Sequence, residues 1–143
     1  MTFQPKILLV DDDPVSRQLI ARMLESLGFS DVTGSQDGLE AWNLVKTSLE
    51  HLAPFDLVIT DWKMPRFDGL KLLSVIRAHE ASAQMKVIML TGLHEREEVA
   101  KAATYKVSDY IVKPANVETL RAKVEKVLGQ KCPGKSNLNK TGT

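Results

Sequence analysis

Four short runs of apolar residues recur along the chain, and within each run the apolar residues do not alternate with polar ones. The runs occupy residues 7–10, 57–59, 87–90 and 110–112, and a less regular candidate surrounds Val32 and Thr33. Continuous runs of this length are typical of strands that are buried on both faces of a parallel sheet. The pattern therefore predicts five β-strands.

The segments between the predicted strands have apolar residues at three- and four-residue spacings, which is the period of an amphipathic helix. This spacing covers residues 15–27, 39–49, 70–76, 99–103 and 117–127. Gly28 is suited to end the first helix, and Asp68 stands near the start of the third. Strand and helix thus alternate five times, which predicts a single doubly wound α/β domain with helices on both faces of a parallel sheet.

The composition agrees with one globular domain, and the distribution of charge along the chain adds to the picture. The 143 residues include 19 Lys plus Arg and 18 Asp plus Glu, which gives a formal charge of +1. Residues 129–143 contain three lysines and no acidic residue, so residues 1–128 hold 16 basic and 18 acidic residues. We expect a domain over residues 5–128 and a disordered basic tail or linker over residues 129–143. This balance gives little electrostatic support for direct nucleic-acid binding.

Cysteine, histidine and hydropathy exclude further classes. Cys132 is the only cysteine, and the three histidines share no ligand-like spacing, so neither an intrachain disulfide nor a structural zinc site is expected. The longest apolar runs have four residues, whereas a helix needs about 20 to cross a bilayer. Residues 1–6 lack the apolar segment of a secretory signal. We expect a soluble, cytoplasmic protein without membrane insertion.

Polar side chains follow four of the predicted strands. Asp11, Asp12 and Asp13 follow the first, Thr60 and Asp61 the third, Thr91 the fourth, and Lys113 the fifth. Because sites in open parallel sheets lie outside the carboxyl ends of the strands, these residues should meet at one edge. Asp13 before Pro14 is most simply a helix N-cap. Capping does not explain Asp11, Asp12 and Asp61 together, since clustered carboxylates repel unless a cation or a proton relieves them.

The acidic cluster suits Mg²⁺, because its ligands are carboxylate oxygens without Cys or His. Together with Lys113 and Thr91, a metal ion there would make a phosphoryl-transfer site. The metal and Lys113 would neutralise charge on the phosphoryl oxygens, and Thr91 would donate a hydrogen bond to one of them. Asp61 is the candidate nucleophile, because Asp11 and Asp12 stand together as a metal-binding pair.

These residues stand in motifs that resemble the receiver domain of two-component response regulators over residues 5–128. The motifs are Leu9-Val10-Asp11-Asp12-Asp13, residues 56–65, Asp68-Gly69, Leu90-Thr91-Gly92 and residues 109–114. Their order, at the spacing of β-α units, makes the resemblance specific. It implies a flavodoxin-like fold with five parallel strands in the order 2-1-3-4-5.

The resemblance implies a role as a phosphoryl acceptor. By this resemblance, Asp61 accepts a phosphoryl group from a phosphohistidine on a sensor histidine kinase or a histidine phosphotransfer protein. Asp12 and Asp61 bind Mg²⁺ together with the backbone carbonyl of Lys63, and Asp11 assists through an ordered water. The protein would dephosphorylate itself and would not turn over a separate substrate as an enzyme does.

The resemblance also implies a switch and an output surface. Thr91 and Lys113 contact the phosphoryl oxygens, and Tyr110 changes rotamer as Thr91 moves toward the phosphate. The output surface is formed by the fourth helix, the fifth strand and the fifth helix, and it contacts a downstream protein target. The residues alone leave open whether Tyr110 switches or is simply an aromatic residue at the sheet edge. The 15 residues of the tail are too few for an effector domain, so we expect a stand-alone receiver or a fragment.

The sequence departs from the family pattern at one place, and two further residues stand at positions next to the site that bear on its chemistry. Residues 106–109, before Tyr110, replace a segment where family members often carry a Gly-Ala pair. This change affects the expected shape of the loop and of the output surface. Lys63 stands two residues after the acceptor Asp61, and Leu93 stands two residues after Thr91. Our hypothesis is that these two residues tune the phosphoryl lifetime by controlling the approach of water.

Two other functions fit parts of the sequence. Asp11-x-Asp13-x-Val15 matches the signature of haloacid-dehalogenase-type phosphatases, in which Asp11 would be the nucleophile and Asp13 the acid/base. That alternative leaves residues 61–65 unexplained. A receiver-like binding module that signals without phosphorylation is a third possibility, and the complete set of acceptor, acid pair, threonine and lysine argues against it.

Overall fold

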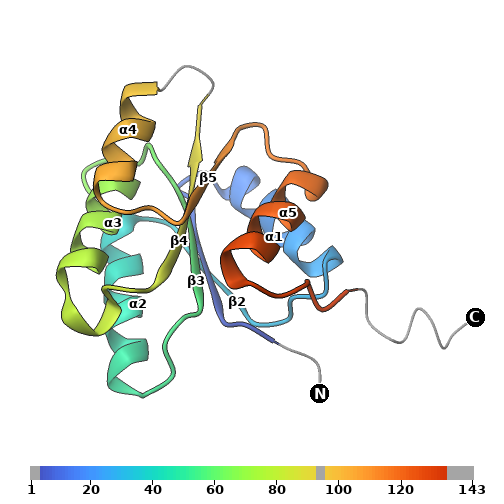
Figure 1. Cartoon of the computed structure of the whole chain (residues 1–143), viewed down its shortest axis with the longest axis horizontal. Coiled ribbons are helices and arrows are strands. Elements are labelled where there is room, and N and C mark those ends of the chain that lie inside the picture. The colour runs from blue at the N-terminus through green and yellow to red at the C-terminus, as the bar shows by residue number, and fades with distance from the viewer. Residues whose placement is uncertain (1–3, 93–95, 135–143) are drawn as a thin grey trace, which may run out of the picture.

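The protein is a five-stranded parallel sheet with helices on both faces (Figure 1). A computed structural model of the chain describes residues 4–92 and 96–134. The strands are β1 (Ile7–Val10), β2 (Val32–Ser35), β3 (Leu57–Asp61), β4 (Lys86–Thr91) and β5 (Asp109–Val112). They lie in the order β2-β1-β3-β4-β5, and each neighbouring pair is parallel. The predicted doubly wound fold and its strand order are confirmed.

Helices α2, α3 and α4 cover one face of the sheet, and α1 and α5 cover the other (Figure 1). Their bounds are α1 (Pro14–Ser26), α2 (Gly38–Glu50), α3 (Gly69–Ala78), α4 (Arg96–Thr104) and α5 (Val117–Leu128), with a 3₁₀ turn η1 (Glu80–Ser82) between α3 and β4. The predicted N-cap at Asp13 is confirmed, because its Oδ1 accepts a hydrogen bond from the Val15 N–H at 3.1 Å. Aspartate or asparagine side chains cap α2, α3 and α5 in the same way, at Asp37, Asp68 and Asn116.

The core consists of two apolar layers, one on each face of the sheet. All four residues of β1 are fully buried, as expected for a central strand with helices on both sides. Ile20 and Leu24 of α1 close the layer on one face, and Leu72 and Ile76 of α3 close the layer on the other. The central strands are therefore held on both sides, and their carboxyl ends are fixed in position. Among the described residues, no helix combines the length and the apolar character needed to cross a bilayer.

The apolar face predicted for the first helix is only partly buried. Val15 and Leu19 of α1 are 74% and 54% exposed, whereas Ile20, Leu24 and Leu27 are buried. Leu19 directly precedes the buried Ile20, so the difference is one of direction around the helix: at about 100° per residue, Val15 and Leu19 stand on a different side of α1 from Ile20, Leu24 and Leu27. Apolar residues at three- and four-residue spacing occur on both sides, so the spacing alone does not show which side faces the sheet.

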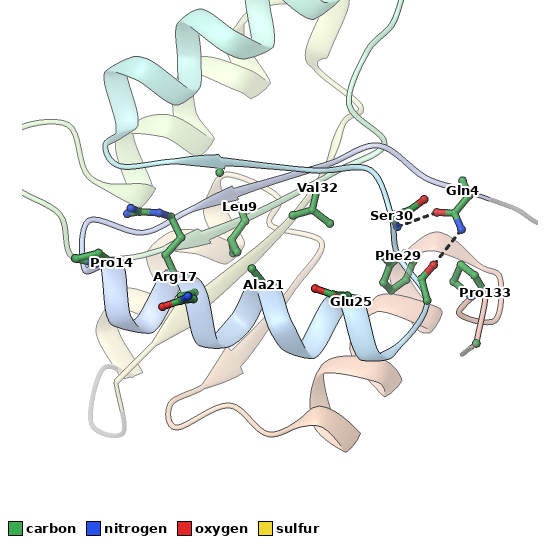
Figure 2. Close-up of a pocket in the computed structure, with 14 residues that line it drawn as sticks. Gln4, Leu9, Pro14, Arg17, Ala21, Glu25, Phe29, Ser30, Val32 and Pro133 are labelled. Atoms are coloured by element: carbon green, nitrogen blue, oxygen red, sulfur yellow. Dashed lines mark hydrogen bonds between the residues drawn. The ribbon is translucent and has the colours of Figure 1, made fainter. Parts of the chain in front are cut away.

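The segment after α5 differs from the expectation of a disordered tail in its first six residues, 129–134, which we call the C-terminal clasp. Gly129 adopts a left-handed conformation (φ 69°) that ends α5 and turns the chain back. The Gly134 N–H then donates to the Leu27 carbonyl at 2.9 Å, and the Cys132 N–H donates to Glu125 Oε2 at 2.9 Å. The clasp thus lies against the end of α1 (Figure 2). Residues 135–143 of the predicted tail lie outside the described residues.

Candidate functional site

The predicted site residues meet at the carboxyl edge of the sheet. Asp11 directly follows β1, Asp61 is the last residue of β3, Thr91 is the last residue of β4, and Lys113 directly follows β5. Backbone hydrogen bonds continue past the strand ends: the Asp11 N–H donates to the Ser35 carbonyl at 3.0 Å, and the Lys113 N–H donates to the Thr91 carbonyl at 2.7 Å. Parallel pairing thus brings together side chains that are far apart in the sequence.

Asp11, Asp12 and Asp61 form the acidic cluster that the sequence predicts, with one carboxylate oxygen of each residue within 4.8 Å of the others. Asp11 and Asp61 are buried, and Asp12 is exposed. Asp11 Oδ1 accepts a hydrogen bond from the Asp13 N–H at 3.0 Å. Asp11 Oδ2 is buried and has no hydrogen-bond partner among the described residues. An unpaired buried carboxylate oxygen is costly, which favours a cation or a water at this point.

The Asp61 carboxylate is held by two donors. Its Oδ1 accepts from the Trp62 N–H at 2.9 Å, and its Oδ2 lies 2.8 Å from Lys113 Nζ. Burial raises the pKa of Asp61, and the charge of Asp11 adds to this rise, while Lys113 opposes it. Burial would lower the pKa of Lys113, but the hydrogen bond to Asp61 and the charges of the acidic cluster raise it above its usual value. The resulting site holds an ammonium among carboxylates.

The loop after β3 is fixed closely against Asp61. The Trp62 N–H donates to the Leu90 carbonyl at 3.0 Å, and the Gly69 N–H donates to the Trp62 carbonyl at 2.8 Å. A Cβ atom at Gly69 would lie 2.2 Å from the Asp61 carbonyl oxygen, so only glycine fits there. In the sequence, Gly69 stands in the Asp68-Gly69 motif at the predicted start of a helix. Its packing role depends on a tertiary contact, and the Asp68-Gly69 pair was its only signal.

Thr91 and Tyr110 lie on adjacent strands. Thr91 is buried, and its hydroxyl donates to the Gly92 carbonyl at 3.3 Å. Tyr110 pairs with Met89, two residues before Thr91 in β4, and is 38% exposed. Lys123 Nζ lies 5.3 Å from the centroid of the Tyr110 ring, within the range of a cation–π contact. Leu93, which we expected to influence phosphoryl lifetime, lies outside the described residues.

Sequence reasoning missed an ion-pair cluster beside Tyr110. Asp109 is buried, with Lys123 Nζ 3.0 Å from its Oδ1 and Lys126 Nζ 3.3 Å from its Oδ2. Burial alone would raise the pKa of Asp109, but Lys123, the hydrogen bond from the Tyr110 N–H and Lys126 together outweigh it and hold the pKa below its usual range. The available signal was the spacing of Lys123 and Lys126, which are three residues apart and therefore share one face of α5.

The fold and the site together place the chain among the doubly wound α/β proteins that carry an acidic site at the carboxyl ends of their strands. Here that site consists of three carboxylates, a lysine and a threonine. Residues 7–125 match the response regulator receiver domain family. The chain belongs to this family. Receiver domains of this type are signalling proteins of two-component systems, and the resemblance inferred from the motifs is confirmed.

Chemotaxis proteins are among its relatives. The chain is 39% identical to chemotaxis protein CheY-3 of Vibrio cholerae over 122 residues, which cover 85% of this chain and 90% of the relative. It is 36% identical to chemotaxis protein CheY of Pseudomonas aeruginosa, with 85% of this chain and 94% of the relative covered.

Solved structures share the fold. The structure of Vibrio cholerae chemotaxis protein CheY4 has a TM-score of 0.78 at 28% identity, covering 88% of this chain and 100% of that one. The receiver domain of a Pseudomonas aeruginosa sensor histidine kinase has a TM-score of 0.77 at 28% identity, covering 90% and 100%. That second structure has a magnesium ion coordinated in its active site cleft.

Proposed function

We propose that this chain is a phosphorylation-activated receiver that takes a phosphoryl group on Asp61 from a phosphohistidine donor. The observation that carries the proposal is the Asp61 carboxylate, which is held by Lys113 and Trp62 beside two further carboxylates. In the transfer, the P–N bond of the phosphohistidine breaks and a P–O bond forms to a carboxylate oxygen of Asp61. The donor imidazole keeps the electron pair of the broken bond and takes up a proton.

Lys113 and Thr91 are the proposed ligands of the phosphoryl oxygens. The Lys113 ammonium already lies 2.8 Å from the acceptor carboxylate, so it is in position to neutralise charge that arrives with the phosphoryl group. The Thr91 hydroxyl donates a long, local hydrogen bond of 3.3 Å to the Gly92 carbonyl. It can exchange that bond for one to the phosphate, and Tyr110 on the neighbouring strand is the proposed residue that responds.

The donor set fits a magnesium ion. All its members are oxygen ligands, and the buried Asp11 Oδ2 has no hydrogen-bond partner among the described residues. We assign Asp12, Asp61 and the backbone carbonyl of Lys63 as ligands, with Asp11 acting through a water. A bound Mg²⁺ would offset the charge of the carboxylates and of the phosphoryl group. The magnesium ion in the related Pseudomonas receiver supports this assignment.

The proposed partners are proteins. A histidine donor must cover the carboxyl edge of the sheet to reach Asp61, and Val15 and Leu19 of α1 are exposed beside that edge, where they can contact it. For output, we propose the surface of α4, β5 and α5, on which Tyr110 and Val112 are each 38% exposed. The protein would act in the cytoplasm as a signalling acceptor, without turnover of a separate substrate and without direct binding to nucleic acid.

The capping geometry argues against the phosphatase alternative. In that reading Asp13 is the acid/base, but its carboxylate accepts a hydrogen bond from the Val15 N–H and caps α1. The reading also assigns no role to Asp61, whose carboxylate lies within 4.8 Å of the Asp11 and Asp12 carboxylates and 2.8 Å from Lys113. A receiver-like module that signals without phosphorylation would leave the acidic cluster, with its buried Asp11 Oδ2 that is unpaired among the described residues, without a purpose.

Chemical trapping tests the acceptor. The protein is treated with acetyl phosphate and Mg²⁺, reduced with borohydride, digested and mapped by mass spectrometry. We expect the label on Asp61, its loss in Asp61→Asn, and its retention in Asp13→Asn, because asparagine is as good an N-cap as aspartate. Label on Asp11, or steady hydrolysis of an added phosphomonoester, would replace the receiver function with the phosphatase.

Beryllofluoride tests the switch separately. Beryllofluoride with Mg²⁺ mimics an acyl phosphate, and we expect it to shift the amide resonances around Thr91 and Tyr110. If the label maps to Asp61 but these resonances do not move, the chain accepts phosphate without the proposed switch, and the unphosphorylated-module reading gains support.

A further inference from the structure

A groove of about 980 Å³ lies between α1 and the edge strand β2, on the side of the molecule away from the proposed output surface. Arg17, Ala21 and Glu25, spaced four residues apart on α1, form one wall, and Val32 of β2 lies opposite them (Figure 2). Gly34 of β2 also lines the groove. Its volume is near the upper end of the range of about 300–1,000 Å³ that is typical of ligand sites. The proposed phosphorylation chemistry makes no use of this groove.

The outer edge of β2 offers free backbone groups to this groove. Among the described residues, β2 pairs only with β1. The Ile7 N–H donates to the Asp31 carbonyl, and the Asp11 N–H donates to the Ser35 carbonyl, so the backbone groups of these alternate residues point toward β1. In a parallel ladder the intervening residues point the other way. The N–H and C=O groups of Val32 and Gly34 therefore face outward, and both residues line the groove.

This edge lacks the usual protection of an edge strand. Natural sheets commonly place a charge or a proline on an exposed edge, which prevents pairing with another chain. The four residues of β2 are Val, Thr, Gly and Ser, with neither. Within β2 itself, therefore, no charge or proline prevents another strand from pairing with the edge, although Asp31 directly precedes it.

Gly34 is not required by the backbone or by the space around it. No left-handed φ is found there, and a Cβ atom would meet Arg17 Cδ at 3.6 Å, an ordinary contact. Glycine inside a strand weakens the strand, and it is often found where another backbone approaches closely. A Cβ atom at position 34 would point toward Arg17 and not along the edge of the sheet, so an alanine there should leave strand pairing at the edge possible.

The charged walls match the length of a short strand. Arg17 and Glu25 are eight residues apart on α1, which corresponds to about 12 Å along the helix. The same length spans about four residues of a strand. Ala21 lies midway between them and leaves room for one apolar side chain. A strand beside β2 would thus present an acidic residue to Arg17 and a basic residue, four positions away, to Glu25.

We propose that the α1–β2 groove is a docking site for an extended peptide segment of a protein partner, which adds a strand to the edge of β2. The segment hydrogen-bonds to the outward backbone groups of Val32 and Gly34. Its side chains that face α1 are acidic, small apolar and basic in alternate positions, opposite Arg17, Ala21 and Glu25.

A defined probe tests the site without any phosphodonor and with EDTA present, so the result is independent of the proposed phosphorylation. The probe is the peptide acetyl-Thr-Asp-Thr-Val-Thr-Lys-Thr-amide, and its matched control has Ser in place of Asp and Lys. In an NMR titration, we expect the probe to shift the Val32 and Gly34 amide resonances and to slow their hydrogen exchange at least tenfold. We expect the control peptide to bind at least tenfold more weakly.

Variants at the strand edge distinguish pairing from general stickiness. Gly34→Pro removes one outward N–H that the β1–β2 ladder does not use, and we expect it to lose probe binding, whereas Gly34→Ala should retain it. If Gly34→Pro does not fold, the variant Glu25→Lys serves instead. It is tested with a second peptide, in which Asp replaces the Lys of the probe. We expect this peptide to bind Glu25→Lys tenfold more tightly than it binds the unmodified protein. Unchanged Val32 and Gly34 resonances at millimolar probe, or binding that survives in folded Gly34→Pro, would overturn the proposal.

Discussion

Replacing Asp12 with asparagine should stabilise the protein in the absence of metal, although most substitutions destabilise proteins. Asp12 carries a negative charge within 4.8 Å of the Asp11 and Asp61 carboxylates. Asp12 is exposed, and the dielectric constant of water then gives about 0.9 kcal/mol of repulsion for each pair at that distance. The attraction of Asp12 to Lys113 cancels a part of the two repulsions. A net gain of about 1 kcal/mol remains for Asp12→Asn.

Thermal unfolding at low salt with EDTA is the assay. A gain of about 1 kcal/mol corresponds to a rise in Tm of about 3 °C for a chain of this size. In 1 M salt the screening length falls to about 3 Å, so the rise should largely disappear. Asp37→Asn is the matched control, because it also removes one acidic charge and keeps an N-cap, but it lies outside the acidic cluster. We expect no stabilisation from the control.

Magnesium should reverse the order of stability. A ligand at 100 times its Kd stabilises a folded protein by about 2.7 kcal/mol, and Asp12→Asn removes one proposed ligand of the ion. The unmodified protein should therefore become more stable than the variant when Mg²⁺ is added. A variant that is less stable than the unmodified protein in EDTA at low salt would refute the reasoning that the cluster is under electrostatic strain. A variant that gains as much from Mg²⁺ as the unmodified protein would refute the metal assignment.

Three further outcomes follow from the packing. Gly69→Ala should destabilise by about 3 kcal/mol in urea unfolding, because its Cβ would lie 2.2 Å from the Asp61 carbonyl oxygen; an unchanged midpoint would contradict this. Lys106→Gly should stabilise by about 0.5–1 kcal/mol, since Lys106 has φ 60°, whereas Lys101→Gly within α4 should destabilise by about 1 kcal/mol. Asp109→Asn should destabilise by about 1–2 kcal/mol at pH 7. Because the pKa of Asp109 is lowered in the folded state, this loss should shrink as the pH falls below the usual carboxyl range, and a loss that is independent of pH would contradict it.

The sequence predicts the position of the acidic site because that position depends on strand order and burial, which the apolar runs encode. Asp11 and Asp61 each stand at the end of a continuous apolar run, and parallel strands bring such ends to one edge. By contrast, the exposure of Val15 and Leu19 depends on where α1 contacts the sheet, which helical spacing does not define. Apolar periodicity therefore predicts that a helix forms here, but not which of its apolar flanks faces the sheet.

Features that rest on a single tertiary contact could not be predicted. The left-handed conformation of Lys106 is an example, because the family pattern of glycine is absent and no local signal replaces it. In the structure, the Lys106 carbonyl accepts hydrogen bonds from Arg77 Nε at 3.1 Å and Nη2 at 2.9 Å. The same guanidinium donates to the Met85 carbonyl. Arg77 thus stabilises the turn after α4 from a helix that is distant in sequence, and no local sequence rule reports such a bond.

The same contacts bear on how a change at the acidic edge could reach the output surface. At its C-terminal end, α4 is fixed by the Arg77 bonds to Lys106 and by Ser108, whose N–H donates to the Val87 carbonyl while its hydroxyl accepts from the Val87 N–H. Ala102 is buried beneath the last turns of α4. A helix that is held at one end moves most easily at the other, and the N-terminal end of α4 follows Thr91 in the chain. If phosphorylation of Asp61 draws Thr91 toward the site, the displacement of α4 should therefore decrease from its first turn to its last. Hydrogen exchange of the α4 amides, measured with and without phosphorylation, checks this polarity. An increase on phosphorylation that is larger in the last turn of α4 than in its first turn would contradict it.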